Sequence, residues 1–175
     1  MSDQQDQSRC LAYRLAGVAV AHHAQGQVLP ALDLRRPALD DDSGRPWPVD
    51  LGSGARHRLE LQILAQWAGL MSEARACHEG REPAGGWGAA REPLTALGHR
   101  VTRSDEENEA YLEWLRRRAV GLLDLPGTWT AIEKLAEALC RDGSVGGGQA
   151  MALITGVQQA QRRRSGISSW FRSVR

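Results

Sequence analysis

Apolar residues recur every three or four positions along most of this chain, a spacing that predicts amphipathic helices. The first such segment runs from about Gln7 to Ala24 and stops near Gly26, which suits a left-handed helix cap. The second segment runs from Ala55 to about Glu79. Its apolar stripe covers a wide arc of the helix surface, so we expect the second helix to be the most buried one.

Three more helices are predicted in the second half of the chain. Ser104 and Glu107 form a capping box, because each side chain can accept a hydrogen bond from a free backbone N–H at the helix start. The expected helices cover residues 104–123, 128–141 and 149–161, and their breakers are Pro126, Gly127 and Gly143. On the first of them, Tyr111, Trp114, Leu115, Ala119 and Leu122 are expected to face the core.

Stretches rich in Gly and Pro separate these helices. Residues 27–50 read as an irregular loop or a short two-stranded β-ribbon, because Pro30, Pro46 and Pro48 limit strand pairing to edges. Residues 80–103 are expected to be irregular, with a helical turn near residues 94–97. The predicted fold is mainly α: an orthogonal bundle of five to six helices over residues 1–160, followed by a basic, aromatic tail over residues 161–175.

Composition narrows the class of protein. The 175 residues are enough for one domain with a real core, and a net charge of +1 gives no overall field for nucleic acid. No apolar run approaches the roughly 20 residues that span a bilayer, and the polar start does not read as a signal peptide. Cys10, Cys77 and Cys140 lie far apart, which predicts free thiols in a reducing cytoplasm.

A short motif near the start resembles a known active site. The stretch AYRLAGVAV, at residues 12–20, resembles the active-site helix of the FtsH-like zinc metallopeptidase domain, in which the motif is HExxH. In that motif two His one turn apart bind zinc, and the Glu between them activates the metal-bound water.

The resemblance implies a motif that has lost its metal ligands and its catalytic base. It places Arg14 on the first His, Leu15 on the Glu and Val18 on the second His. A guanidinium repels a cation, and neither aliphatic side chain can bind metal or accept a proton. We therefore expect no zinc, no catalysis, and a role in binding a protein or peptide or in regulation.

The resemblance continues further along the chain. Residues 60–74, 104–115 and 128–139 resemble later helices of that domain, and Asp105 falls within a residue or so of its third zinc ligand. Asp105 and Arg14 are therefore expected to form an ion pair across the former metal site. No GxxxxGK[ST] phosphate loop is found, so no ATP binding is expected.

Two other interpretations stay open. One is an active metal-dependent hydrolase with a displaced site drawn from His22, His78, Glu79 and Asp105. It is weakened because His22 and His23 are neighbours that point about 100° apart on a helix, and because Gly80 and Pro83 interrupt the stretch HEGRE. The other is a helical interaction protein unrelated to peptidases.

The C-terminal tail is a candidate surface for partners. No acidic residue follows Asp142, and the candidate contacts are Arg162, Arg163, Arg164, Trp170, Phe171 and Arg172. A basic, aromatic helix of this kind suits an acidic protein, an anionic membrane or nucleic-acid phosphates. The simpler interpretation is a frayed terminus with one apolar anchor. The stretch VGGGQ, at residues 145–149, is predicted to be a cap or hinge, since no strand is expected before it.

Overall fold

The fold is mainly helical, as predicted. The computed structural model describes residues 2–36, 53–79 and 87–172, and these contain six helices and one two-stranded antiparallel ribbon. The elements are α1 (Ser2–Ala24), β1 (Leu32–Asp33), α2 (Ser53–Cys77), α3 (Gly88–Gly98), α4 (Asp105–Leu123), α5 (Thr128–Asp142), β2 (Ser144–Val145) and α6 (Gly147–Arg172). None of the described helices is both long and apolar enough to cross a membrane.

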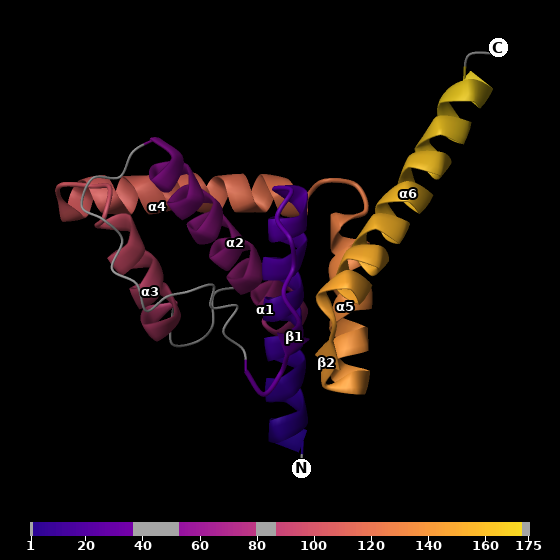
Figure 1. Cartoon of the computed structure of the whole chain (residues 1–175), viewed down its shortest axis with the longest axis horizontal. Helices are drawn as coiled ribbons and strands as arrows, with labels where there is room; N and C mark the ends of the chain where they lie inside the picture. Colours follow the sequence, from indigo (N-terminus) through magenta and orange to yellow (C-terminus); the bar gives the residue numbers. More distant parts are fainter. Residues whose placement is uncertain (1, 37–52, 80–86, 173–175) are drawn as a thin grey trace.

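The helices form two groups around a central pair (Figure 1). Helices α1 and α2 pack against each other in the centre, α3 and α4 lie on one side, and α5 and α6 lie on the other. The middle of α1 is buried on almost every side, with Leu15, Ala16, Val18, Ala19 and Val20 all at or below 3% exposure. The expectation that the second helix alone would be central is therefore too narrow, because α1 shares that place.

Helix ends follow the local sequence signals. Ser104 Oγ accepts a hydrogen bond from the Glu107 amide at 3.1 Å, as the capping box predicts. The Glu107 carboxylate reaches one residue further back than expected and accepts from the Arg103 amide at 2.8 Å. Gly127 and Gly143 flank α5 with φ of 85° and 75°, values that favour glycine.

Strand β1 pairs with a different segment from the one expected. Leu32 of β1 pairs with Val145 of β2, so the second strand comes from the far side of α5 and not from within residues 27–50. A strand therefore does precede the glycine run, contrary to the prediction. Gly147 allows a close approach there, since a Cβ at this position would overlap the Leu29 carbonyl. Residues 37–52 lie outside the described part of the chain.

Two helices on the α3–α4 side differ from the prediction. Residues 88–98 form a full helix around Pro93, where only a turn was expected. On α4 the buried side chains are Asn108, Leu112, Leu115, Ala119 and Leu123. Leu115 and Ala119 are buried as expected, but the stripe continues through Leu112 and Leu123 in place of Tyr111 and Leu122. Trp114, expected in the core, is therefore 46% exposed.

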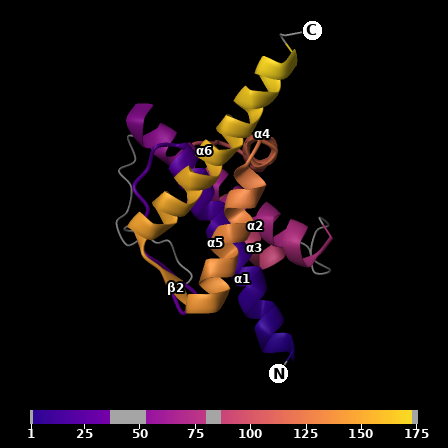
Figure 2. The ribbon, with the colours of Figure 1, turned by 90° about the vertical axis from the view of Figure 1, so that its right-hand side faces the viewer.

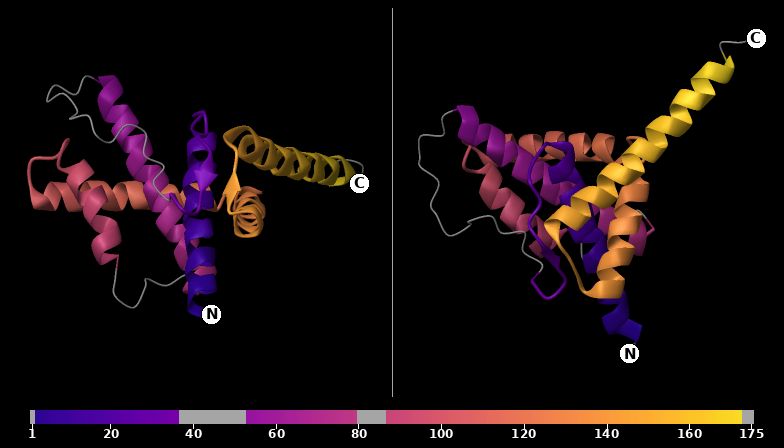
Figure 3. Two further views of the ribbon diagram at one scale, coloured as in Figure 1. Left: turned by 60° about the horizontal axis from the view of Figure 1, so that its bottom comes forward. Right: turned by 45° about the vertical axis from the view of Figure 1, so that its right-hand side comes forward.

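Helix α6 is longer than predicted. It continues without a break past residue 161, the expected start of the tail, and ends at Arg172. Ala150, Ile154 and Val157 bury its first half against the body. The second half extends away from the other helices in every view (Figures 1, 2 and 3).

The prediction of three free thiols is wrong. Cys10 of α1 and Cys77 of α2 form a disulfide, and their Cα atoms are 5.9 Å apart, within the range that such a bond requires. Cys140 is free and exposed. The wide spacing of the cysteines pointed away from a disulfide, but the packing of α1 against α2 brings two residues 67 positions apart together.

Candidate functional site

The candidate site lies on the seam between α1 and α2, which run antiparallel. Positions spaced one helical turn apart face one another along this seam. Cys10 is bonded to Cys77, and Arg14 forms an ion pair with Glu73. One turn further, Val18 packs directly on Gly69, where an added Cβ would lie 2.5 Å from Val18 Cγ2. The seam is thus fixed by a covalent bond, an ion pair and a close apolar contact.

The stretch that resembles the zinc motif takes part in this packing. Leu15 and Val18 are 2% and 3% exposed and belong to the hydrophobic core, so neither side chain faces solvent. Arg14 remains 37% exposed at the edge of the core. Of the three motif positions, only Arg14 is therefore available to a ligand.

The expected ion pair between Arg14 and Asp105 is not formed. Arg14 pairs with Glu73 instead, which lies on α2 one turn before the disulfide. The carboxylate of Asp105 is 99% exposed, and its Oδ1 lies 3.3 Å from His99 Nε2. The physical reason is the place of Asp105: the N-terminus of α4 packs beside α3 and not beside α1.

An open groove adjoins this seam. It has a volume of about 650 Å³ and is lined by the first turns of α1 and the last turns of α2. Its charged and polar lining includes Asp6, Gln7, Arg9, Arg14, Glu73 and His78, and the Cys10–Cys77 disulfide forms part of its wall. We call it the seam groove. Both signs of charge are present, which suits a peptide better than a highly charged ligand.

Aromatic and cationic side chains support the outside of the seam. Tyr13 stacks on Trp129 of α5 with ring centroids 5.9 Å apart. The Arg9 guanidinium lies over Tyr13 at 5.9 Å, and the Arg75 guanidinium lies over Trp129 at 4.1 Å. These cation–π contacts hold Arg9 near the groove and tie α1, α2 and α5 together.

A similar arrangement joins α2 to α4. The Tyr111 hydroxyl donates to Glu60 Oε1 at 3.2 Å, and its ring stacks on Trp114 with centroids 6.0 Å apart. Burial, followed by the negative charge of Glu60, raises the pKa of Tyr111 from 10.0 to about 12. Tyr111 therefore stays a neutral donor throughout the physiological range, which keeps this contact intact.

A second groove, between α3 and α4, has a volume of about 710 Å³. Its lining includes Arg91, Glu109 and the His99–Asp105 pair. Buried Asn108 is one of its lining residues, and Asn108 Nδ2 donates to the Thr95 carbonyl at 3.0 Å. Asn108 therefore connects α3 to α4.

The candidates for a displaced metal site do not come together. His78 lines the seam groove, whereas Asp105 lines the groove between α3 and α4. His22 contacts the Gln27 side chain at the end of α1, and Glu79 follows α2 with a φ of 53°. Among the described residues no three His, Cys, Asp or Glu side chains are grouped so that they could hold a metal ion.

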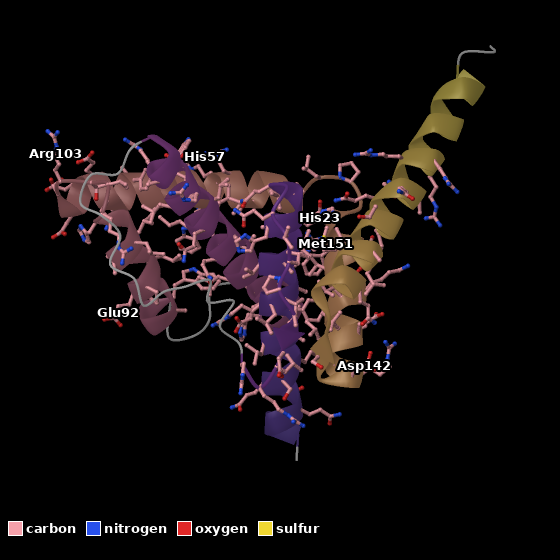
Figure 4. The ribbon with its side chains drawn as sticks, viewed as in Figure 1. His23, His57, Glu92, Arg103, Asp142 and Met151 are labelled. Atoms are coloured by element: carbon pink, nitrogen blue, oxygen red, sulfur yellow. A yellow bond between two sulfur atoms is a disulfide. The ribbon has the colours of Figure 1, made fainter. Side chains whose placement is uncertain are left out.

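The remaining histidines are also dispersed. His23 Nε2 lies 3.2 Å from Thr155 Oγ1, which links the end of α1 to α6 near Met151 (Figure 4). His57 lies at the start of α2, at a distance from His23 in the same view. These two histidines therefore lie on different parts of the fold.

The tail candidates divide into two groups. Arg162, Arg163 and Arg164 are exposed on the part of α6 that extends from the body. The backbone of Trp170, Phe171 and Arg172 is helical, but their side chains lie outside the described set. The basic patch is thus carried on a helix, where a frayed end was the simpler expectation.

Glu73 and the disulfide were missed in the sequence, although a signal for them existed. Cys10 and Arg14 are four residues apart on α1, and Glu73 and Cys77 are four residues apart on α2. Two antiparallel helices place such pairs opposite each other, thiol to thiol and cation to anion. The mirrored spacing could have suggested this register.

Comparison with models of protein families, with curated proteins and with solved structures found no match to this chain.

Proposed function

We propose that this protein is a catalytically inactive relative of FtsH-type zinc metallopeptidases that binds a protein or peptide segment in the seam groove. One observation carries the proposal: the positions that resemble the catalytic motif are used for packing. Leu15 and Val18 are buried in the core, and Arg14 pairs with Glu73 at the groove edge. Helix α1 is kept, but the positions that resemble catalytic residues pack against other side chains. Such an arrangement suits recognition better than hydrolysis.

The chemistry of the groove supports a peptide as the ligand. Arg14 is partly exposed, so a peptide can reach the Arg14–Glu73 pair. Arg14 can then bind a peptide carboxylate or amide oxygen, and Glu73 can bind a peptide amine or amide N–H. Gln7 adds neutral hydrogen-bonding groups, and Leu11 adds an apolar contact. The proposal requires no ATP and no resident cofactor, and it includes a cytoplasmic location.

A direct experiment uses a tryptic digest of casein as the probe. Full-length protein is immobilised, and the retained peptides are identified by mass spectrometry. The Gln7→Trp variant fills the groove from an exposed position on α1, and Gln5→Trp places the same ring on the same helix outside the groove lining. We expect the wild type and Gln5→Trp to retain peptides and Gln7→Trp to lose them.

The same preparation tests the absence of catalysis. We expect intact casein to remain uncut when zinc is supplied. Cleavage that depends on zinc would overturn the inactive assignment, and equal peptide retention by both tryptophan variants would overturn the seam groove as the binding site. Retention by none of the proteins would remove the proposed binding altogether.

A further inference from the structure

The disulfide between Cys10 and Cys77 is placed differently from a typical structural disulfide. Structural disulfides are usually protected from solution thiols, whereas exposed ones are commonly labile or regulatory. Both of these cysteines are only half-buried, and both line the open seam groove. A small thiol that enters the groove therefore comes close to both cysteines without unfolding of the chain.

The groove contains a cation that can attract the attacking thiol. The attacking species is a thiolate anion, and nearby cations stabilise it. Arg9 and Arg14 line the same groove, and Arg9 is exposed and held over the Tyr13 ring. Arg14 is paired with Glu73, and Asp6 lines the same groove, so Arg9 is the cation that can attract a thiolate there.

The bond also lies between the exposed start of α1 and its buried middle. Side chains from Gln5 to Arg9 are exposed, whereas residues 15–21 of α1 are all buried. At the other end of the bond, Cys77 is the last residue of α2. Breaking this bond removes the covalent tie of the first α1 turns to the end of α2 and leaves the buried seam beyond Arg14 in place.

We propose that Cys10 and Cys77 form a thiol–disulfide exchange site, through which small-molecule thiols such as glutathione change the shape of the seam groove. A glutathione thiolate attacks one cysteine sulfur, the S–S bond breaks, and the other cysteine leaves as a thiolate and takes up a proton. A second glutathione thiolate then releases the first cysteine, so that two glutathione molecules become one oxidised glutathione. This chemistry is independent of the proposed peptide binding, because it is measured without a peptide.

The test follows the redox state of the folded protein. The Cys140→Ser variant removes the exposed free thiol, so that only the two groove cysteines report. The protein is oxidised with oxidised glutathione, then exposed to millimolar reduced glutathione with or without urea, alkylated and weighed intact. We expect no alkylation before reduction, alkylation of both cysteines afterward, and a native rate that approaches the rate in urea.

Hydrogen exchange then shows whether reduction changes only the surroundings of the groove or destabilises the whole fold. We expect reduction to lower protection in residues 5–13 and 73–78, while α4 and α5 keep theirs. Three results would overturn the proposal: no bond after oxidation, reduction that needs urea, or loss of protection across the whole molecule. Chemical reduction of one protein supplies both states, so the result does not depend on whether a cysteine variant folds.

Discussion

At the scale of single residues, the seam between α1 and α2 depends on small side chains. Gly69 lies against Val18 and the Arg14 carbonyl, and Gly17 lies against the Ala68 carbonyl. The helices can approach this closely only because these positions lack a Cβ. Such packing is what turns the sequence that resembles a catalytic motif into a structural contact.

The Gly69→Ala substitution should therefore destabilise the protein. The new Cβ would lie 2.5 Å from Val18 Cγ2 and 2.9 Å from the Arg14 carbonyl, so the helices must move apart. We expect a loss of about 1–3 kcal/mol in the free energy of unfolding, measured by urea denaturation. The matched control is Gly121→Ala on α4, where nothing lies within 4 Å and better helix propensity should stabilise by up to about 1 kcal/mol. Equal changes in the free energy of unfolding for Gly69→Ala and Gly121→Ala would contradict the close approach of α1 and α2 at Gly69.

Tyr111 gives a prediction about pH. Its pKa is raised from 10.0 to about 12 by burial and then by Glu60, so the folded state favours the neutral phenol. This contribution to stability is complete below pH 10.0 and is lost as the pH rises through about 12. Ultraviolet titration, with Tyr111→Phe subtracted, should show the late ionisation.

The Glu60→Gln variant serves as its control. Removing the carboxylate charge should lower the pKa of Tyr111 part of the way toward 10.0, because burial remains the larger cause. An unchanged midpoint would show that the Tyr111–Glu60 contact across α2 and α4 is not made.

At the scale of elements, the sequence predicts best where a helix carries its own boundaries. Helix α5 has glycines at both ends and a strong apolar stripe, and its predicted range differs from the observed one by a single residue. Helix α6 has no such end signal, and its arginine-rich continuation reads as a tail. The partner of β1 was missed because strand pairing between distant segments depends on how the helices pack.

The two halves of α6 should contribute unequally to stability. The first half buries Ile154 completely, and the second half extends away from the body. We expect the free energy of unfolding of a chain ending at Arg164 to lie within about 0.5 kcal/mol of that of the full protein, because surface changes usually have effects of this size. Ile154→Ala should cost about 2–5 kcal/mol. A truncation as costly as Ile154→Ala would mean that the extended half packs on the body.

At the scale of the whole molecule, the candidate site was only partly predictable. The resemblance singled out Arg14, Leu15 and Val18 as positions without metal ligands, and the sequence could not supply the partners that the fold gives them. Glu73 and Gly69 reach those positions because α2 runs antiparallel to α1. Asp105 was assigned by resemblance along the chain, and the packing of α4 beside α3 takes it elsewhere.

The central proposal is that packing occupies the positions at the start of this fold that resemble a metal-binding motif. Its most direct test is elemental analysis of the full-length protein, purified without chelators and then equilibrated with zinc. The buried aliphatic side chains of Leu15 and Val18 and the Arg14–Glu73 pair predict no stoichiometric zinc at this site. Stoichiometric zinc that is lost when Glu73 is changed to Ala would contradict the account.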